Sequence, residues 1–376
     1  MIRILHSVSN MDRAGVETML MNYYRHIDRN KIQFDFLCNK SKPGAYDEEI
    51  KKLGGRIYHT PGLNPFKYFK YLKFMKNFFA EHPEYKIVHA HNGAFIVYPL
   101  FAAKRNKIPV RISHVHSASF TFDYKWPLKV FCKPWIKRCA THKWACGRDA
   151  AKFYYGKKAV ENGETLTINN AIDIDRFLFN KDKRDEIRNK YNLNGKYVIG
   201  HVGRFDKQKN HSFLIDIFSE VSKKDKNAVL LLLGEGALMD EIANKVKNLG
   251  LEEKVIFMGN VDNVNEFYQA MDVFVLPSIW EGLPVVGIEA QAADLPCVFS
   301  DDVTVETTIL PTTCYLSRKD TIEKWAETVL KLKHHKRVDK SVEIKSAGYD
   351  IETESKKLVD IYTKLLGLNK EVKNEA

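Results

Sequence analysis

The sequence predicts an α/β protein of two domains, each built on a parallel sheet covered by helices. Short apolar runs alternate with helix-like segments along the whole chain, as in repeated βαβ units. Glycines follow several of these runs, where a strand would turn into a helix. A chain of 376 residues exceeds the usual size of one hydrophobic core. We therefore expect two Rossmann-like domains.

The first domain is expected to span residues 1–165. Its strands are predicted at 2–6, 34–37, 87–91, 110–115 and 143–146. A helix over about 16–26 follows Gly15, and a glycine at such a turn lets a ligand phosphate approach the backbone closely. Active residues of parallel sheets lie at the carboxyl ends of strands. Two of the predicted strands end in histidines: His89 and His91, and His114 and His116.

The second domain is expected to span residues 166–351. Its strands are predicted at 197–202, 229–233, 255–258, 273–276, 296–300 and 314–316, with a surface helix at 181–190. A last helix is expected over about 352–368, followed by a flexible tail at 369–376.

The loop after the strand at 197–202 combines a glycine with two cations. Arg204 and Lys209 follow Gly203 and are five residues apart. A planar guanidinium and an ammonium on one loop can hold a single diphosphate together. We therefore expect an anion at this loop.

Residues 276–290 are the most informative stretch of the chain. The apolar strand stops at Pro277, and Pro284 suits the first position of a helix, where its missing N–H costs nothing. A helix N-terminus favours a phosphate. Glu281 before the helix and Glu289 within it cannot help to hold an anion, so we expect them to accept hydrogen bonds from sugar hydroxyls. The alternative is that Glu281 is a plain loop residue and Glu289 a solvated helix position.

Two glutamates separated by seven residues, with a Gly-Leu-Pro turn after the first, resemble the signature of the retaining family-4 (group 1) glycosyltransferases. The resemblance implies the GT-B fold, two facing Rossmann-like domains with an interdomain cleft, and a last helix that returns to the first domain. It implies that Glu281 contacts the donor sugar, Glu289 the ribose, and Arg204 with Lys209 the diphosphate. The implied nucleotide-sugar site also includes Gly15, Gly203, Gly234, Val261, Gly282, Leu283 and Pro284.

The same family has a catalytic histidine after the fifth strand that contacts the donor sugar. His116 matches it better by position than His114, which we expect to point the other way. Residues 165–173 resemble the family's strand that ends in Asn-Gly-Ile-Asp at the passage between the domains. Ala14 and Ala171 stand where the family usually has glycine.

The resemblance implies a hexosyltransferase that retains configuration and needs neither metal nor cofactor. Its donor would be a nucleotide-diphosphate sugar, with UDP favoured, and its acceptor a lipid-linked or other saccharide in capsule or exopolysaccharide synthesis. The sequence identifies neither sugar nor acceptor, and it does not distinguish uridine from guanosine. The alternatives are a nucleotide-sugar epimerase on the same architecture and, less favoured, a nucleic-acid-binding protein.

Positive charge is concentrated in the first half of the chain. Residues 1–165 hold 29 Lys+Arg against 13 Asp+Glu, a net charge of +16, whereas the remainder has a net charge of −4. A helix at 65–80 would place Tyr68, Tyr71, Leu72, Met75 and Phe79 on its core face. The opposite face would carry cations mixed with aromatic residues: Lys67, Lys70, Lys73 and Lys76 with Phe66, Phe69 and Phe74.

Aromatic residues between cations are typical of a bilayer interface, and residues 120–138 repeat this composition. The alternative is that they close the core or line an acceptor cleft. No apolar run is long enough to span a membrane, and the six cysteines lack the spacing of a metal site. We expect a cytoplasmic protein held peripherally on the anionic inner face of the cell membrane, with no nucleic-acid partner.

Overall fold

The computed structural model describes residues 1–63, 68–120 and 123–367. The chain divides into two compact units, Met1–Ala171 with Ile351–Ala376 and Ile172–Asp350. The first unit extends six residues beyond the boundary expected at 165. The chain returns to the first unit through the last helix, α16 (Ile351–Leu365).

The first unit contains a seven-stranded parallel sheet in the order β3-β2-β1-β4-β5-β6-β7. Its strands are β1 (Ile2–Val8), β2 (Ile32–Cys38), β3 (Ile57–His59), β4 (Ile87–Ala90), β5 (Val110–Val115), β6 (His142–Ala145) and β7 (Thr165–Thr167). Its other helices are α1 (Gly15–His26), α2 (Asp47–Lys52), α3 (Tyr68–Glu81), the 3₁₀ turn η2 (Gly93–Ile96), α4 (Val97–Arg105), α5 (Trp126–Cys139), α6 (Arg148–Tyr155) and α7 (Lys157–Glu161).

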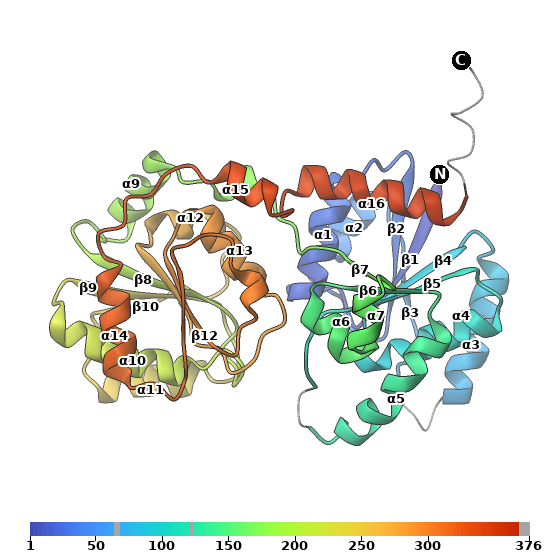
Figure 1. Ribbon diagram of the computed structural model, residues 1–376, viewed down its shortest axis with the longest axis horizontal. Helices are drawn as coiled ribbons and strands as arrows, with labels where there is room; N and C mark the ends of the chain where they lie inside the picture. The colour runs from blue at the N-terminus through green and yellow to red at the C-terminus, as the bar shows by residue number, and fades with distance from the viewer. Residues whose placement is uncertain (64–67, 121–122, 368–376) are drawn as a thin grey trace, which may run out of the picture. The chain divides into compact units, whose positions relative to one another are not determined.

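The helices α1 and α16 pack together over one face of this sheet, and α3, α4 and α5 lie on its other side (Figure 1). Strands covered on both faces bury almost every side chain, which explains their continuous apolar sequences. Tyr23 of α1 and Tyr362 of α16 are fully buried in the shared core. The last helix therefore belongs to the hydrophobic core of the first unit.

The second unit contains a six-stranded parallel sheet in the order β10-β9-β8-β11-β12-β13. Its strands are β8 (Tyr197–Val202), β9 (Ala228–Leu233), β10 (Val255–Phe257), β11 (Val273–Leu276), β12 (Cys297–Ser300) and β13 (Thr313–Leu316). Its helices are α8 (Ile174–Phe177), α9 (Lys181–Lys190), α10 (His211–Lys224), α11 (Met239–Asn248), α12 (Val264–Ala270), α13 (Val285–Ala292), the 3₁₀ turn η3 (Val305–Thr307), α14 (Ile322–Lys331) and α15 (Ser341–Ser346).

This strand order reverses direction at β8, because β9 lies on one side of it and β11 on the other. Such a reversal is the usual ligand position of a doubly wound sheet. In the first unit the same kind of reversal lies between β1 and β4. The two reversal points carry the two groups of side chains described below.

The basic helix predicted at 65–80 is present as α3. The exposure of one aromatic residue on its polar face differs from the prediction. Tyr71, Met75 and Phe79 are buried as predicted, and Lys70, Lys73 and Lys76 are exposed. Phe69 is 86% exposed, but Phe74 is only half-exposed because it stacks on Phe78. Lys67 and Phe66 lie outside the described residues. No helix in the described ranges is both long and apolar enough to cross a bilayer.

Candidate active site

The second unit brings two loops together at the reversal of its sheet. The loop after β8 and the loop after β11 leave neighbouring strands, so they run side by side. The Ile279 N–H donates to the Gln208 carbonyl at 2.8 Å, and the Asn210 side chain donates to the Pro277 carbonyl at 3.2 Å. These bonds fix the loop that carries Lys209 against the loop that carries Glu281.

Three glycines allow the strand ends beside these loops to approach closely. The Gly203 N–H donates to the Leu233 carbonyl at 2.9 Å, and the Gly234 N–H donates to the Gly259 carbonyl at 2.8 Å. Gly234 has φ +127°, and a Cβ at this position would lie 2.2 Å from the Gly203 carbonyl oxygen. A Cβ at Gly203 would lie 3.1 Å from the Lys209 side chain. Larger residues would therefore displace Lys209 or separate the strand ends.

Lys209 and Glu281 form a buried ion pair across the two loops. The Nζ–Oε1 distance is 2.6 Å, and the side chains are 14% and 8% exposed. The Ser278 hydroxyl donates to the same oxygen at 2.9 Å, and the Gln208 amide donates to Oε2 at 3.2 Å. A buried carboxylate needs such partners because desolvation is costly. Glu281 is therefore not a plain loop residue, although Ser278 and Gln208 were not among the predicted site residues.

Arg204 does not share this buried position. Its side chain is 67% exposed and pairs with Asp206, with an Nη2–Oδ2 distance of 3.1 Å. Asp206 also accepts from the Lys209 backbone N–H at 3.2 Å. The two cations therefore contact different carboxylates, and a shared diphosphate remains a prediction.

Glu289 is buried on α13, contrary to the alternative of a solvated helix position. The Tyr268 hydroxyl donates to its Oε2 at 2.9 Å. Burial raises the pKa of Glu289 to about 7, while this hydrogen bond and the charge of Arg176 act in the opposite direction. Tyr268 lies on α12, and no sequence pattern predicts its contact with Glu289.

The turn between the glutamates is formed largely as predicted. Pro284 precedes α13 as its N-cap and is not its first helical residue, a shift of one position. Leu283 is buried, and Gly282 lies in the loop before it. Val261 is half-buried in the loop between β10 and α12.

The predicted site residues Gly15 and His116 lie in the first unit. Gly15 begins α1, and a Cβ there would meet no atom within 4 Å. His116 directly follows β5, and its ring centroid lies 4.2 Å from that of His114. The expectation that His114 points the other way is wrong, because residues two apart on a strand share one face.

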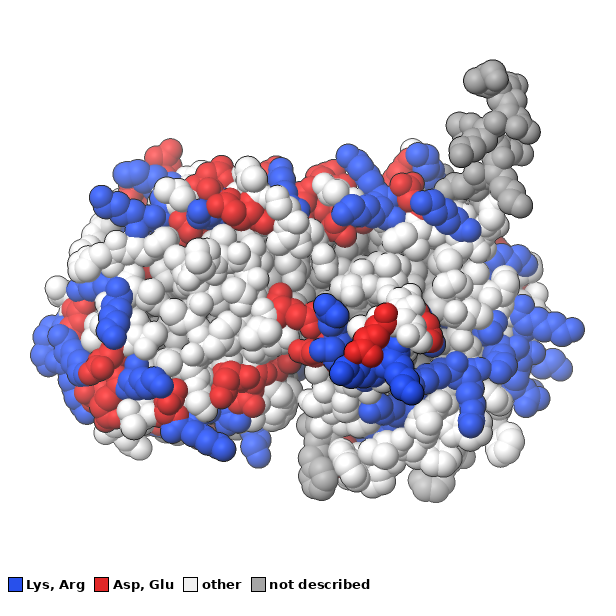
Figure 2. All heavy atoms as spheres, viewed as in Figure 1, with Lys and Arg blue, Asp and Glu red and all other residues white. Residues whose placement is uncertain are grey.

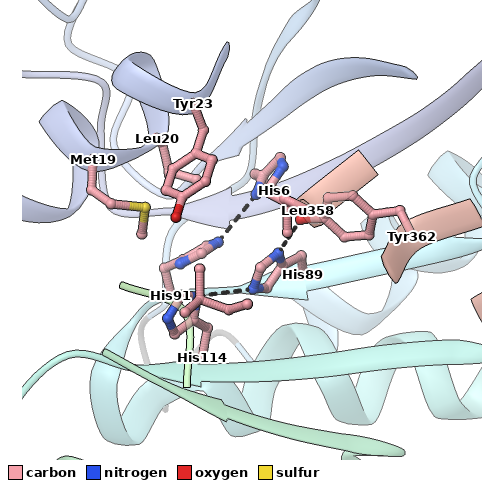
Figure 3. Close-up of a pocket in the computed structure, with 10 residues that line it drawn as sticks. His6, Met19, Leu20, Tyr23, His89, His91, His114, Leu358 and Tyr362 are labelled. Carbon is pink, nitrogen blue, oxygen red and sulfur yellow. Dashed lines mark hydrogen bonds between the residues drawn. The ribbon is translucent and has the colours of Figure 1, made fainter. Parts of the chain in front are cut away.

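Five histidines meet at the reversal point of the first sheet. His6 of β1, which the prediction missed, lies opposite His89 in the parallel pairing of β1 with β4. Nitrogen–nitrogen distances of 3.0–3.1 Å join three ring pairs: His6 with His91, His91 with His116, and His89 with His114. Figure 3 shows four of these rings gathered beside Tyr23 and Tyr362.

These rings are neutral at pH 7. Burial lowers the pKa of His6 and His116 to about 3. The pKa values of His89, His91 and His114 lie well below the usual range, mainly because of burial and further because neighbouring imidazoles would repel a second charge.

Comparison with known proteins identifies the class. Residues 183–350 match the family model "Glycosyl transferases group 1", and residues 13–176 match "Glycosyltransferase Family 4". The chain is 35% identical over 369 residues to the putative glycosyltransferase EpsF of Bacillus subtilis (strain 168), covering 96% of each protein. The chain therefore belongs to the group 1 and family 4 glycosyltransferases, of the capsule and exopolysaccharide type.

Two further similarities describe the relatives and the fold. The capsular polysaccharide biosynthesis glycosyltransferase CapH of Staphylococcus aureus is 25% identical over 388 residues, which cover 96% of this chain and 99% of CapH. The structure of Anabaena HepE in complex with UDP and glucose matches with a TM-score of 0.74 at 16% identity, covering 99% of this chain and 98% of HepE. The fold is accordingly GT-B.

Proposed function

We propose that this glycosyltransferase moves a sugar from a UDP-sugar to a lipid-linked saccharide during synthesis of a cell-surface polysaccharide, with retention of configuration. The observation that carries the proposal is the buried Lys209–Glu281 pair next to the glycine-lined strand ends of the second unit. Glu289 lies on the helix that follows the same loop. The name of CapH supports the polysaccharide setting, and the UDP bound to HepE supports the uridine donor.

Each donor group has a partner of matching chemistry in this proposal. Glu281 accepts hydrogen bonds from sugar hydroxyls, and Glu289 accepts them from the ribose. Lys209 and Arg204 neutralise the diphosphate as it leaves, so the transfer needs no divalent ion at that position and no further cofactor. The Arg204 side chain is exposed, and its ion pair with Asp206 lies at the surface. Because surface ion pairs contribute little free energy, Arg204 can turn toward the anion at a small free-energy cost.

His116 and Gly15 are assigned to the donor sugar and the donor phosphate in the same proposal. The ring of His116 is half-buried and neutral, so one nitrogen can accept and the other can donate a hydrogen bond. The open space beside Gly15 suits the close approach of a phosphate.

The acceptor class follows from an apolar surface on α5. Surface helices normally expose polar residues. On α5 the exposed residues recur about every four positions, and most of them are apolar. Phe131 is 66% exposed, and the remaining exposed residues of this face are Trp126, Pro127, Val130, Pro134 and Trp135. Cys132, Ile136 and Cys139 form the buried face.

Cations surround this α5 surface. The guanidinium of Arg138 lies 4.8 Å from the ring centroid of Trp135, and α5 contains no acidic residue. Figure 2 shows Lys and Arg gathered over α3 and α4, next to a largely uncharged region around α5. Tryptophan beside lysine and arginine suits the interface of an anionic bilayer. We therefore assign the protein to the cytoplasmic face of the membrane, where a lipid-linked acceptor would be available.

Vesicle sedimentation tests the attachment. The parent should bind anionic vesicles at low salt, and a variant with Phe131→Ser and Trp135→Ser should lose most of this binding. Val305→Ser and Val342→Ser remove similarly exposed apolar residues from the second unit and serve as the matched control. Equal binding by the parent and the α5 variant would contradict the assignment. Full loss in a Lys70, Lys73 and Lys76→Glu variant alone would move the anchor to α3.

A coupled assay tests the transfer. The purified protein is incubated with UDP-sugars, with and without a lipid-diphosphate-linked saccharide, and both UDP and sugar products are measured. Release of UDP that depends on the acceptor is expected. A changed sugar nucleotide formed without acceptor would support the epimerase alternative instead.

A further inference from the structure

The buried carboxyl of Glu289 depends on a single hydrogen bond. Its Oε2 accepts from the Tyr268 hydroxyl at 2.9 Å, and the described residues offer this carboxyl no other donor. Glu281, in contrast, is surrounded by an ammonium, a hydroxyl and an amide. We infer that Tyr268 is a positioning residue of the nucleotide site: through this one bond it keeps Glu289 charged and directed at the ribose. The inference rests on the proposed role of Glu289.

The Tyr268 ring has little freedom to move. It is fully buried on α12, and its centroid lies 5.8 Å from those of both Phe177 of α8 and Phe274 of β11. Its hydroxyl reaches α13 at two points, Glu289 Oε2 and the Val286 carbonyl, which lies 3.2 Å away. Residues three apart on a helix are neighbours on its surface, so the hydroxyl lies over the face that carries Glu289. The tyrosine therefore fixes the direction of this carboxyl.

Two arginines hold the end of α12 that carries Tyr268. The last carbonyls of a helix have no partners within the helix. Arg337 donates to the carbonyls of Tyr268, Gln269 and Met271 at 2.9–3.2 Å. Arg184 donates to those of Gln269 and Met271, at 2.9 and 2.8 Å. Because cations are favourable at a helix C-terminus, these contacts stabilise the position of Tyr268 over α13.

The hydroxyl of Tyr268 can serve both protonation states of Glu289. When Glu289 is ionised, the Tyr268 O–H donates to Oε2, and the carboxylate keeps its remaining acceptor positions for the ribose. When Glu289 takes up a proton from solvent, its O–H can donate to the tyrosine oxygen, and the Tyr268 O–H turns to the Val286 carbonyl. The charged form gains more from the tyrosine, because hydrogen bonds to ionised groups are the stronger ones.

Tyr268 is the main protein group that favours the charged form of Glu289. Burial raises the pKa of Glu289 to about 7, against the opposing effects of Tyr268 and then of Arg176. Arg176 on α8 is exposed, so water weakens its effect. The elements packed against α13 carry further titratable groups that do not shift this pKa: Asp175, Glu266, Cys297, Glu343 and Lys345.

Calorimetry with UDP from pH 6 to pH 9 tests the inference on Tyr268→Phe, which removes one oxygen and keeps the ring. A hydrogen bond that favours the charged form tenfold lowers the pKa by about one unit. The rise of UDP affinity with pH, centred near pH 7 in the parent, should therefore move about one unit higher in the variant. UDP should bind about fivefold more weakly at pH 7, with less than about a twofold difference at pH 9. A deficit of the same size at every pH would indicate a merely structural role and overturn the inference.

Tyr197→Phe is the matched control. It removes another buried hydroxyl, which donates to the Val329 carbonyl from the first residue of β8, at the opposite end of that strand from the donor loop. Its midpoint should be parental. Glu289→Gln corrects for the titration of UDP, and adding Tyr268→Phe to it should change UDP affinity less than about twofold, because the tyrosine acts through the charge of Glu289. A further tenfold loss would contradict this.

Urea unfolding follows the same titration without UDP. The folded pKa of Glu289 lies above its reference value of 4.5, so its contribution to stability falls as the pH rises and stops falling near pH 7 in the parent. In Tyr268→Phe this fall should continue about one pH unit further, measured against the double variant with Glu289→Gln. If Tyr268→Phe is poorly folded, Arg337→Lys, which cannot bridge three carbonyls, should shift the titration in the same direction.

The two measurements separate this inference from the proposed function. A parent that does not bind UDP would refute the proposed function, whereas a shifted titration in urea would still support the role of Tyr268. An unshifted titration in urea would overturn the inference and leave sugar transfer, which the coupled assay measures, unaffected.

Discussion

The raised pKa of Glu289 predicts that UDP binding depends on pH. With a pKa of about 7, roughly one tenth of the Glu289 carboxyls are ionised at pH 6 and nine tenths at pH 8. The carboxylate is the form that accepts hydrogen bonds from both ribose hydroxyls. The contribution of Glu289 to UDP affinity should therefore rise up to about tenfold between pH 6 and pH 8.

Calorimetry with UDP separates this effect from the titration of the ligand itself. Glu289→Gln keeps the size of the side chain but does not ionise, so its pH dependence reports only the ligand. At pH 8 the variant should bind about 10- to 100-fold more weakly, because a hydrogen bond to a charged group contributes roughly 1.5–3 kcal/mol. The difference between parent and variant should shrink about tenfold at pH 6. An equal difference at both pH values would refute the assigned role.

The same pKa predicts an opposite effect on stability. The folded pKa of about 7 lies above the reference value of 4.5, so the unliganded fold favours the protonated form. Stability from this group is present below pH 4.5 and is lost as the pH rises through 7. Glu289→Gln should therefore be more stable than the parent at pH 8, by up to about 3 kcal/mol, and similar to it at pH 4.5. Urea unfolding at the two pH values measures this, and a destabilised variant at pH 8 would contradict it.

Three further predictions concern the second unit. Arg204→Ala and Lys209→Ala should each lower turnover about a hundredfold, which corresponds to roughly 3 kcal/mol of activation free energy. Lys207→Ala, which changes an exposed lysine of the same loop, should keep parental turnover. Near-parental turnover in both Arg204→Ala and Lys209→Ala would contradict their assignment to the diphosphate. Glu281→Gln should leave UDP affinity almost unchanged in calorimetry but lower transfer, and an equal loss of UDP affinity to that of Glu289→Gln would contradict the division of roles. His211 is buried with its pKa lowered to about 2, so its neutral form stabilises the fold above pH 6.5 and this contribution is lost as the pH falls. Below pH 6.5 the unfolding free energy of the parent should fall more steeply with decreasing pH than that of His211→Gln, by about 1.4 kcal/mol per pH unit. Urea unfolding over this pH range measures both slopes, and equal slopes would show that His211 is not the group responsible.

Most of the fold could be predicted from the sequence because parallel strands buried on both faces have distinctive apolar runs. The predicted strand ends differ from those of the structure by at most two residues. β3 (Ile57–His59) was missed because three residues carry too little pattern. Pro284 was placed one position too far into its helix because proline is favoured at the first helical position, whereas here it precedes that position as the N-cap.

The side-chain partners could not be predicted, because they depend on strand order. Lys209 and Glu281 are 72 residues apart and meet only because β8 lies next to β11. His6 joins the other histidines for the same reason, through the pairing of β1 with β4. The exposed apolar face of α5 was suggested by composition, but only the burial of Cys132 and Ile136 identifies which side faces solvent.

The anomeric configuration of the transferred sugar tests the central claim most directly. The product of the acceptor-dependent reaction with an α-configured UDP-sugar is purified, and its new linkage is assigned from the anomeric proton coupling by NMR. The proposed function predicts an α-linkage, formed by the parent and nearly absent with Glu281→Gln. A β-linkage, or the same yield from the variant, would contradict a retaining transfer organised by Glu281.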